Sequence, residues 1–282
     1  IKMTGYDAGD LTRMIEKVTS GATAALGNIE MAGFSADNLT SMVEKVTSGA
    51  TEAMGEIEMV GFSADNLTSM VEKVTAGATS SLGKIEMAGY DSTKLTGMME
   101  KVTAGATGAL GNIKMSGFEA GDLSGMVEKI SAGATSALGE IKMTGYDSND
   151  LSAMVEKVTS GTTGALGKIQ MDGFSADNVS SLESTISSST TTALGQIQMD
   201  GFDPNNIPSD LTNSINTGVT SGQQKQPPIL KEIVAVSSPT TNTTPSYTFS
   251  SSKAGTISYE GSCKSSITSA SSGNNTVTFN AL

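Results

Sequence analysis

The residues that could carry chemistry in this chain are a recurring glutamate–lysine pair, small clusters of aspartates and one cysteine. Histidine is absent, which removes the usual general base and the commonest metal ligand. No Ser–His or Cys–His pair can form, and near-identical sequence units cannot supply an asymmetric acid–base site. The sequence therefore predicts that the protein is not an enzyme.

The glutamate–lysine pair has two interpretations. It could form a strip that binds a ligand, or a solvent-facing ladder in which the lysine of one repeat meets the glutamate of the next. We favour the ladder, in which each exposed ion pair would contribute at most about 1 kcal/mol to stability. The pair recurs at Glu16-Lys17, Glu44-Lys45, Glu72-Lys73, Glu100-Lys101, Glu128-Lys129 and Glu156-Lys157.

Aspartates cluster where helices are expected to begin, as with Asp7 and Asp10 or Asp147 and Asp150. Calcium takes about six to eight oxygen ligands, and the EF-hand spacing with its distal glutamate is missing here. We interpret these aspartates as helix caps; calcium is the one cofactor that the sequence leaves open. The methionines fall on apolar faces and indicate core packing rather than a metal site: Met3, Met14, Met31 and Met42.

One 28-residue unit recurs eight times, without insertion or deletion, from Ile1 to Gln224. Such a period predicts stacked units that contact mainly their neighbours. The seventh unit (169–196) loses the glutamate–lysine pair, and the eighth (197–224) gains two prolines. Terminal units of solenoids diverge because their outer face meets water. We therefore expect the array to end at 224 and further repeats to precede Ile1.

The first half of a repeat, taken from residues 29–56, predicts a helix of about 12 to 14 residues. Ser35 is the expected N-cap, and Phe34 and Leu39 have the spacing of a hydrophobic staple. Gly49 is placed to end the helix in a left-handed conformation. The apolar face consists of residues at helical spacing: Leu39, Met42, Val43 and Val46.

The second half of the repeat is open to two interpretations. In the favoured one, Thr51 caps a second short helix that carries Ala53, Met54 and Ile57, and Gly61 terminates it. In the other, residues 57–59 form a short strand, and each repeat becomes a β–α unit similar to a leucine-rich repeat. The predicted fold class is mainly α: a solenoid of eight units with two short helices each.

The C-terminal part has a different composition. A short linker (225–228) separates the array (1–224) from a region (229–282) that is rich in serine, threonine and asparagine. Alternating apolar residues predict strands at 233–236, 246–249, 256–260 and 276–282, with turn residues between them. Strands at this spacing predict part of an all-β, immunoglobulin-like sandwich.

The segment from Pro239 through Ala254-Gly-Thr-Ile and Gly261-Ser-Cys to Gly273-Asn-Asn-Thr-Val-Thr-Phe resembles the immunoglobulin-like modules of very large bacterial surface and adhesin-type proteins. The resemblance covers about 45 residues, under a fifth of the chain. It implies export, attachment to the cell surface and a tandem modular architecture. It also implies that Cys263 pairs with a second cysteine further along such a module.

The net charge of −12 and the absence of a basic patch exclude a nucleic-acid partner, and no apolar run is long enough for membrane insertion. These features together predict a structural, non-catalytic segment of a secreted or cell-surface bacterial protein, acting as a spacer, fibre or filament subunit. Self-association into a fibre or filament is the expected interaction. The alternative is an adhesin in which the side face of the solenoid binds a protein partner at the cell surface.

Overall fold

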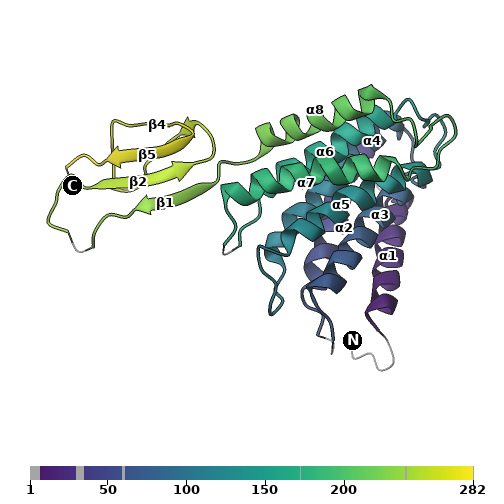
Figure 1. Ribbon diagram of the computed structural model, residues 1–282, viewed down its shortest axis with the longest axis horizontal. Coiled ribbons are helices and arrows are strands. Elements are labelled where there is room, and N and C mark those ends of the chain that lie inside the picture. Colours follow the sequence, from purple (N-terminus) through teal and green to yellow (C-terminus); the bar gives the residue numbers. More distant parts are fainter. Residues whose placement is uncertain (1–6, 30–34, 59–60, 172, 239, 282) are drawn as a thin grey trace. The chain divides into compact units, whose positions relative to one another are not determined.

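A computed structural model describes residues 7–29, 35–58, 61–171, 173–238 and 240–281. The chain divides into two compact units, residues 1–174 with 179–226 and residues 227–282 with 175–178. The first unit is helical and the second is a small β region (Figure 1). The principal helices are α1 (Ala8–Ala25), α2 (Ala36–Met54), α3 (Ala64–Leu82), α4 (Ser92–Ala109), α5 (Leu123–Ser136), α6 (Leu151–Leu166), α7 (Ala176–Leu194) and α8 (Ser209–Lys225).

The prediction of two short helices in each repeat is wrong, because each repeat forms one long helix. Helix α2 continues for 19 residues through Gly49, which has no positive φ. Thr51 does not cap a second helix, since its hydroxyl donates to the carbonyl of Thr47 inside α2 at 2.9 Å. The alternative β–α unit is also absent: the described parts of the repeats contain no strand. Single 3-10 turns extend three of the helices, at Leu26–Asn28, Leu110–Asn112 and Ala137–Glu140.

Helix starts follow the local sequence closely. Ser35 is the N-cap of α2, and Ser63 is that of α3. The amide oxygen of Asn66 accepts the N–H of Ser63 at 2.9 Å, so the third helical residue reaches back to the cap. In α1 the same exchange joins Asp7 and Asp10, at 2.8 and 3.2 Å. Short polar side chains at these positions satisfy N–H groups that a helix end otherwise leaves unpaired.

The connectors between helices turn at a glycine. Gly89 has φ +79°, and the N–H of Tyr90 donates to the carbonyl of Met87 at 3.1 Å. This is the turn geometry that requires a positive φ at its third residue. Gly61, which was predicted to end a second helix, instead lies in the equivalent connector with φ +81°. The glycine therefore reverses the chain between two long helices.

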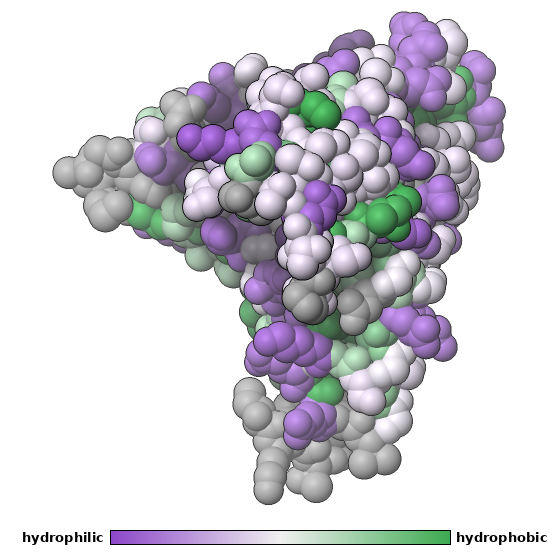
Figure 2. All heavy atoms as spheres, turned by 90° about the vertical axis from the view of Figure 1, so that its left-hand side faces the viewer, coloured by the Kyte–Doolittle hydropathy of each residue, from purple (hydrophilic) through white to green (hydrophobic). Residues whose placement is uncertain are grey.

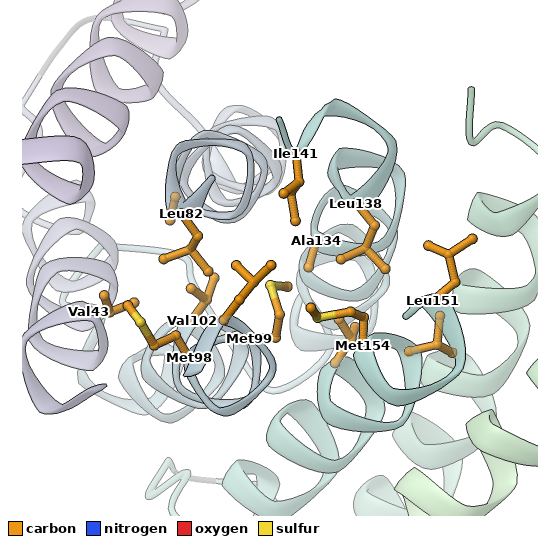
Figure 3. Close-up of a cluster of buried hydrophobic side chains, with 14 of the residues drawn as sticks. Val43, Leu82, Met98, Met99, Val102, Ala134, Leu138, Ile141, Leu151 and Met154 are labelled. Atoms are coloured by element: carbon orange, nitrogen blue, oxygen red, sulfur yellow. The ribbon is translucent and has the colours of Figure 1, made fainter. Parts of the chain in front are cut away.

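The helices form two rows. Helices α1, α3 and α5 pack side by side in one row, and α2, α4, α6 and α8 pack in the other (Figure 1). Consecutive helices lie in different rows, so the hydrophobic core is the layer between the rows. Figure 3 shows Ala134 and Leu138 near Met99 and Met154 of the opposite row, while Met98 points toward Val43 of its own row. Burying each such side chain contributes about 1.5–3 kcal/mol.

The eighth repeat contains one residue more than the 28-residue period would give it. Gly161 of α6 packs on the carbonyl of Glu100, and Gly218 of α8 packs on the carbonyl of Glu156. Gly218 stands one residue later than two periods would place it. Helix α8 therefore ends at Lys225, and Gln226, its C-cap, is buried.

The second unit is antiparallel β, as predicted, but its described residues do not form a sandwich around a core. Strands β1 (Leu230–Val234), β2 (Ser246–Ser251) and β5 (Gly273–Thr278) form one sheet in that order. Strands β3 (Gly255–Thr256) and β4 (Ser269–Ala270) form a separate pair. Of its described hydrophobic side chains only Val277 is buried, whereas Leu230, Ile233 and Val234 are exposed. The predicted strand at 246–249 lies within β2, whereas the predictions at 233–236, 256–260 and 276–282 overlap β1, β3 and β5 only in part, and β4 was not predicted.

Candidate functional site

The interface between helices of the same row is the most heavily repeated feature of the protein. A Cβ on Gly105 of α4 would lie 2.5 Å from the carbonyl oxygen of Glu44 of α2, and one on Gly133 of α5 would lie 2.7 Å from that of Glu72 of α3. These distances are well inside van der Waals contact, so only glycine fits. Gly77, Gly161 and Gly218 repeat the arrangement. Helices α3, α4, α5, α6 and α8 thus pack directly against the backbone of the helix two repeats before each of them.

A second set of glycines brings the connectors together. Gly55 follows α2 and contacts Ile113 and the N–H of Lys114, where a Cβ would be only 2.8 Å away. Gly27, Gly83, Gly111 and Gly139 meet the isoleucine two repeats later in the same way. The connectors that follow successive helices of one row are therefore in contact with each other, at a spacing of two repeats.

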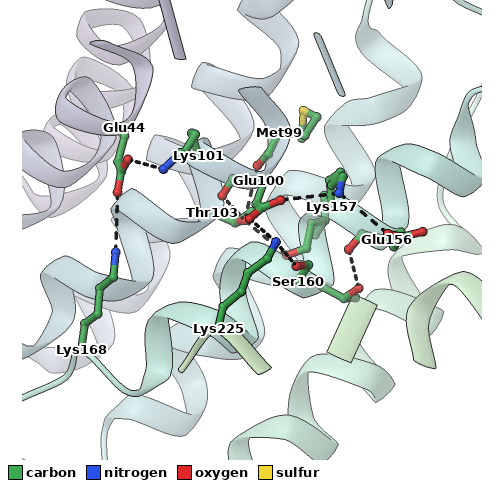
Figure 4. A network of polar contacts seen from close by, with 12 residues as sticks. Glu44, Met99, Glu100, Lys101, Thr103, Glu156, Lys157, Ser160, Lys168 and Lys225 are labelled. Atoms are coloured by element: carbon green, nitrogen blue, oxygen red, sulfur yellow. Dashed lines mark hydrogen bonds and ion pairs between the residues drawn. The ribbon is translucent and has the colours of Figure 1, made fainter. Parts of the chain in front are cut away.

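The glutamate–lysine ladder is present, but it joins alternate repeats rather than successive ones. Lys101 of α4 reaches Glu44 of α2 at 2.9 Å, and Lys129 of α5 reaches Glu72 of α3 at 3.1 Å. Figure 4 shows that Lys168 and Lys225 add further contacts along the second row, to Glu44 and Glu100. The predicted partner was wrong because a lysine faces its row neighbour, not the next helix in sequence. These side chains are partly exposed, so each pair is worth at most about 1 kcal/mol.

The aspartates considered as calcium ligands are engaged in local hydrogen bonds: Asp7 caps α1, whereas Asp147 and Asp150 bond within the turn that precedes α6. Asp150 accepts the N–H of Asp147 at 3.0 Å, and Asp147 accepts that of Asn149 at 2.8 Å. Within the described ranges no three residues of the metal-binding types lie close enough to hold a metal ion. This arrangement stabilises helix starts and offers no convergent oxygen cage.

Two tyrosines close helix ends. The hydroxyl of Tyr90 donates to the carbonyl of Leu82 at 2.9 Å, and that of Tyr146 donates to the carbonyl of Leu138 at 3.1 Å. Burial raises the pKa of both phenols above the ordinary value, and the nearby charge of Asp150 adds to the rise for Tyr146. Their role is structural, since each hydroxyl is a second donor to a helix-end carbonyl that also accepts the N–H of Ile85 or Ile141.

The residues predicted to form the structural face of a repeat fall into three groups. Leu39 and Val43 are buried in the core between the rows, while Met42 and Val46 are half-buried. Gly49 and Ala53 are exposed on α2, because none of the described helices covers that side of it. Phe34 lies outside the described residues, and Cys263 is an exposed free thiol.

Sequence reasoning missed the buried threonines of the row interface, such as Thr47 and Thr103.

The best-defined hollows among the described residues are shallow and open to solvent. A hollow of about 560 Å³ lies between the connectors that follow α5 and α7 and is lined by residues such as Ile141, Tyr146, Met199 and Phe202. Figure 2 shows hydrophobic residues on the face it draws as separate spots among hydrophilic and near-neutral ones. Neither feature assembles the groups that a substrate or cofactor would need.

Comparison with known proteins adds no family: no protein-family model matches the chain, and no curated protein matches it significantly. None of the described helices is both long and apolar enough to cross a membrane. The repeated row interface is thus the feature of this chain from which a function can be argued.

Proposed function

We propose that the helical array is a structural, non-catalytic spacer in an extracellular or cell-surface protein, with a length set by the number of repeats. The observation that carries the proposal is that one interface, glycine on glutamate carbonyl, recurs along both rows. An interface that repeats in register adds length without creating a unique site. The resemblance of the C-terminal segment to modules of bacterial surface proteins supports the location.

The residue types agree with this role. The glycines at one repeat position of α3 to α6 lie against the backbone of a neighbouring helix of the same row, and the lysines of α4 and α5 pair with glutamates of such a neighbour. A protein that bound one partner along its side would instead need exposed positions that differ between repeats. The exposed positions of neighbouring repeats are similar in sequence, so recognition of a single partner is the less favoured function.

The test is to change the number of repeats and to measure length. Deleting residues 57–112 removes one helix from each row and joins Glu56 to Ile113, which keeps the repeat register. The array should shorten by one helix diameter, about 8–10 Å, in small-angle scattering, because neighbouring helix axes are that far apart. Attachment of the parent protein to the cell surface should persist.

A matched control deletes only residues 57–84, one repeat. That change removes a helix from one row only, so the two rows then differ by one helix. The array should therefore shorten by less than it does in the two-repeat deletion. Loss of binding to a specific partner in the two-repeat deletion, with helical content per repeat unchanged, would replace the spacer by a side-face binding module.

A further inference from the structure

The outer face of α1 and α2 carries the surface that the later helices bury against their row neighbours. Met14 and Val18 of α1 are 41% and 63% exposed. The residues at the same repeat positions in α3, Met70 and Val74, are 1% and 0% exposed. The apolar stripe that includes Met70 and Val74 is buried inside the array, and its equivalent on α1 is exposed to solvent.

The glycines of the same stripe show which contact α1 and α2 do not make on this face. A Cβ on Gly77 of α3 would lie 2.9 Å from the carbonyl oxygen of Glu16 of α1. For the equivalent Gly21 of α1 and Gly49 of α2, no described neighbour lies within 4 Å. Both glycines are exposed, so the backbone of another helix could pack on them as the backbone of α1 packs on Gly77.

The opposite end of the array is finished differently. In α7 the glutamate–lysine pair is replaced by Ser184 and Thr185, and its outer side carries exposed hydroxyls such as those of Thr191 and Thr192. These hydroxyls donate to carbonyls one turn earlier in α7, at 2.8 and 3.0 Å. Helix α8 exposes Asn213 and Asn216. The position that holds glutamate in α1 to α6 is Ser184 in α7 and Asn213 in α8, so neither helix has a glutamate there to pair with Lys17 or Lys45.

We propose that the outer face of α1 and α2 is a docking surface for two further antiparallel helices of the same 28-residue type. They would sit on α1 and α2 as these sit on α3 and α4, with a glutamate carbonyl on Gly21 and on Gly49. Their glutamates would pair with Lys17 and Lys45, as Glu16 pairs with Lys73 at 3.8 Å. The surface continues an interface that already repeats through both rows. This inference rests on packing alone and does not depend on the spacer function.

The test extends the chain by a copy of residues 57–112 placed before Ile1, which preserves the repeat register. Both chains carry Val18→Cys as a reporter, and Cys263→Ser removes the native thiol. In the chain without the extension, this thiol should react with a maleimide almost as fast as a free thiol. In the extended chain, the reaction should be at least about tenfold slower, because the docked helix must first open. Circular dichroism should show the added helices folded.

The matched control carries residues 169–225 as its extension, which include the additional residue of the eighth repeat and bring the polar, glutamate-poor helices of the last two repeats. The reporter thiol should then keep a rate within about twofold of the unextended chain. Three results would overturn the proposal: an unprotected thiol or unfolded added helices in the first extension, equal protection by both extensions, or protection in the unextended chain that grows with concentration. The last would assign the face to a second copy of this chain.

Discussion

Glycine in the middle of a helix weakens it by about 1 kcal/mol relative to alanine, so a glycine kept there needs a physical reason. Gly105 and Gly97 lie in the same helix, α4, and differ in that respect. A Cβ on Gly105 would lie 2.5 Å from the Glu44 carbonyl, whereas Gly97 is exposed with no described neighbour within 4 Å. At the scale of single residues, close backbone approach explains one glycine and not the other.

Replacing Gly105 by alanine should lower the free energy of unfolding by about 2 kcal/mol or more, because the new methyl group forces α4 away from α2. Gly97→Ala, in the same helix, should raise it by about 0.5–1 kcal/mol through helix propensity alone. Denaturant titration of the two variants measures both changes. Equal effects of the two substitutions would mean that α4 does not approach α2 through Gly105.

Tyr90 and Tyr146 make stability depend on alkaline pH. Burial raises the pKa of each phenol in the folded state above its ordinary value of 10.0. Their contribution is therefore complete below about pH 10 and falls as the pH rises above that value, since the unfolded chain ionises first. Replacing both by phenylalanine should cost about 1 kcal/mol per hydrogen bond at pH 8.

The same double variant should lose less stability than the parent chain between pH 8 and pH 10.5, because it has no buried phenol to ionise. Urea unfolding at both values gives the comparison, and the difference between the two chains cancels the effect of deprotonating lysines. Identical pH dependence in the two chains would show that these hydroxyls are not buried in the folded state.

At the scale of elements, the same repeat position has different roles in different helices. Met98 of α4 is 0% exposed and Met14 of α1 is 41% exposed, although both occupy the same position of the repeat. The difference is due to neighbours, because α4 has a row partner on each side and α1 has one on a single side. A helix near the α1 end should therefore tolerate substitutions that an interior helix does not.

Met98→Ala should destabilise the array by about 2–5 kcal/mol, since it leaves a cavity in the hydrophobic core around α4. Met14→Ala should cost less than about 0.5 kcal/mol, because little of that side chain is removed from a packed environment. Thermal unfolding of the two variants, each compared with the parent chain, provides the measurement. A large loss for Met14→Ala would show that the α1 face is already covered in solution.

At the scale of the whole molecule, the array is extended by two repeats at a time, one helix in each row. A helix is held mainly by the helices two repeats away, through glycines at its centre and in its connector and through the glutamate–lysine pair. One repeat therefore has no interface of this kind with its sequence neighbour. Stability should grow in steps of one helix per row rather than smoothly with chain length.

Deleting residues 57–112 should lower the denaturant m-value of the helical transition by about a quarter, because m follows the surface that unfolding exposes and two of eight helices are removed. The free energy of unfolding should fall with it, as expected for a chain of nearest-neighbour interactions. An m-value that did not change would indicate that the array does not unfold as one cooperative unit.

Much of the local structure follows from sequence alone. The 28-residue period, the N-caps such as Ser35, the apolar positions Leu39 and Val43 and the β character of the C-terminal part are all legible in the chain. They are legible because caps, helical spacing and alternation act over a few residues. The long helices were missed because Gly49, a helix-ending residue by local rules, stays helical within α2.

The tertiary structure decided which repeats meet. Near-identical units give the same local pattern whether a helix packs on the next repeat or on the one after it, so sequence cannot distinguish Lys101–Glu44 from a pair between successive repeats. That choice depends on the chain reversing at each connector glycine, which puts consecutive helices in opposite rows. Burial of Met70 but not of Met14 is likewise a property of neighbours in space. Local chemistry determined the helix and its faces, and packing between distant segments determined the array and its open end.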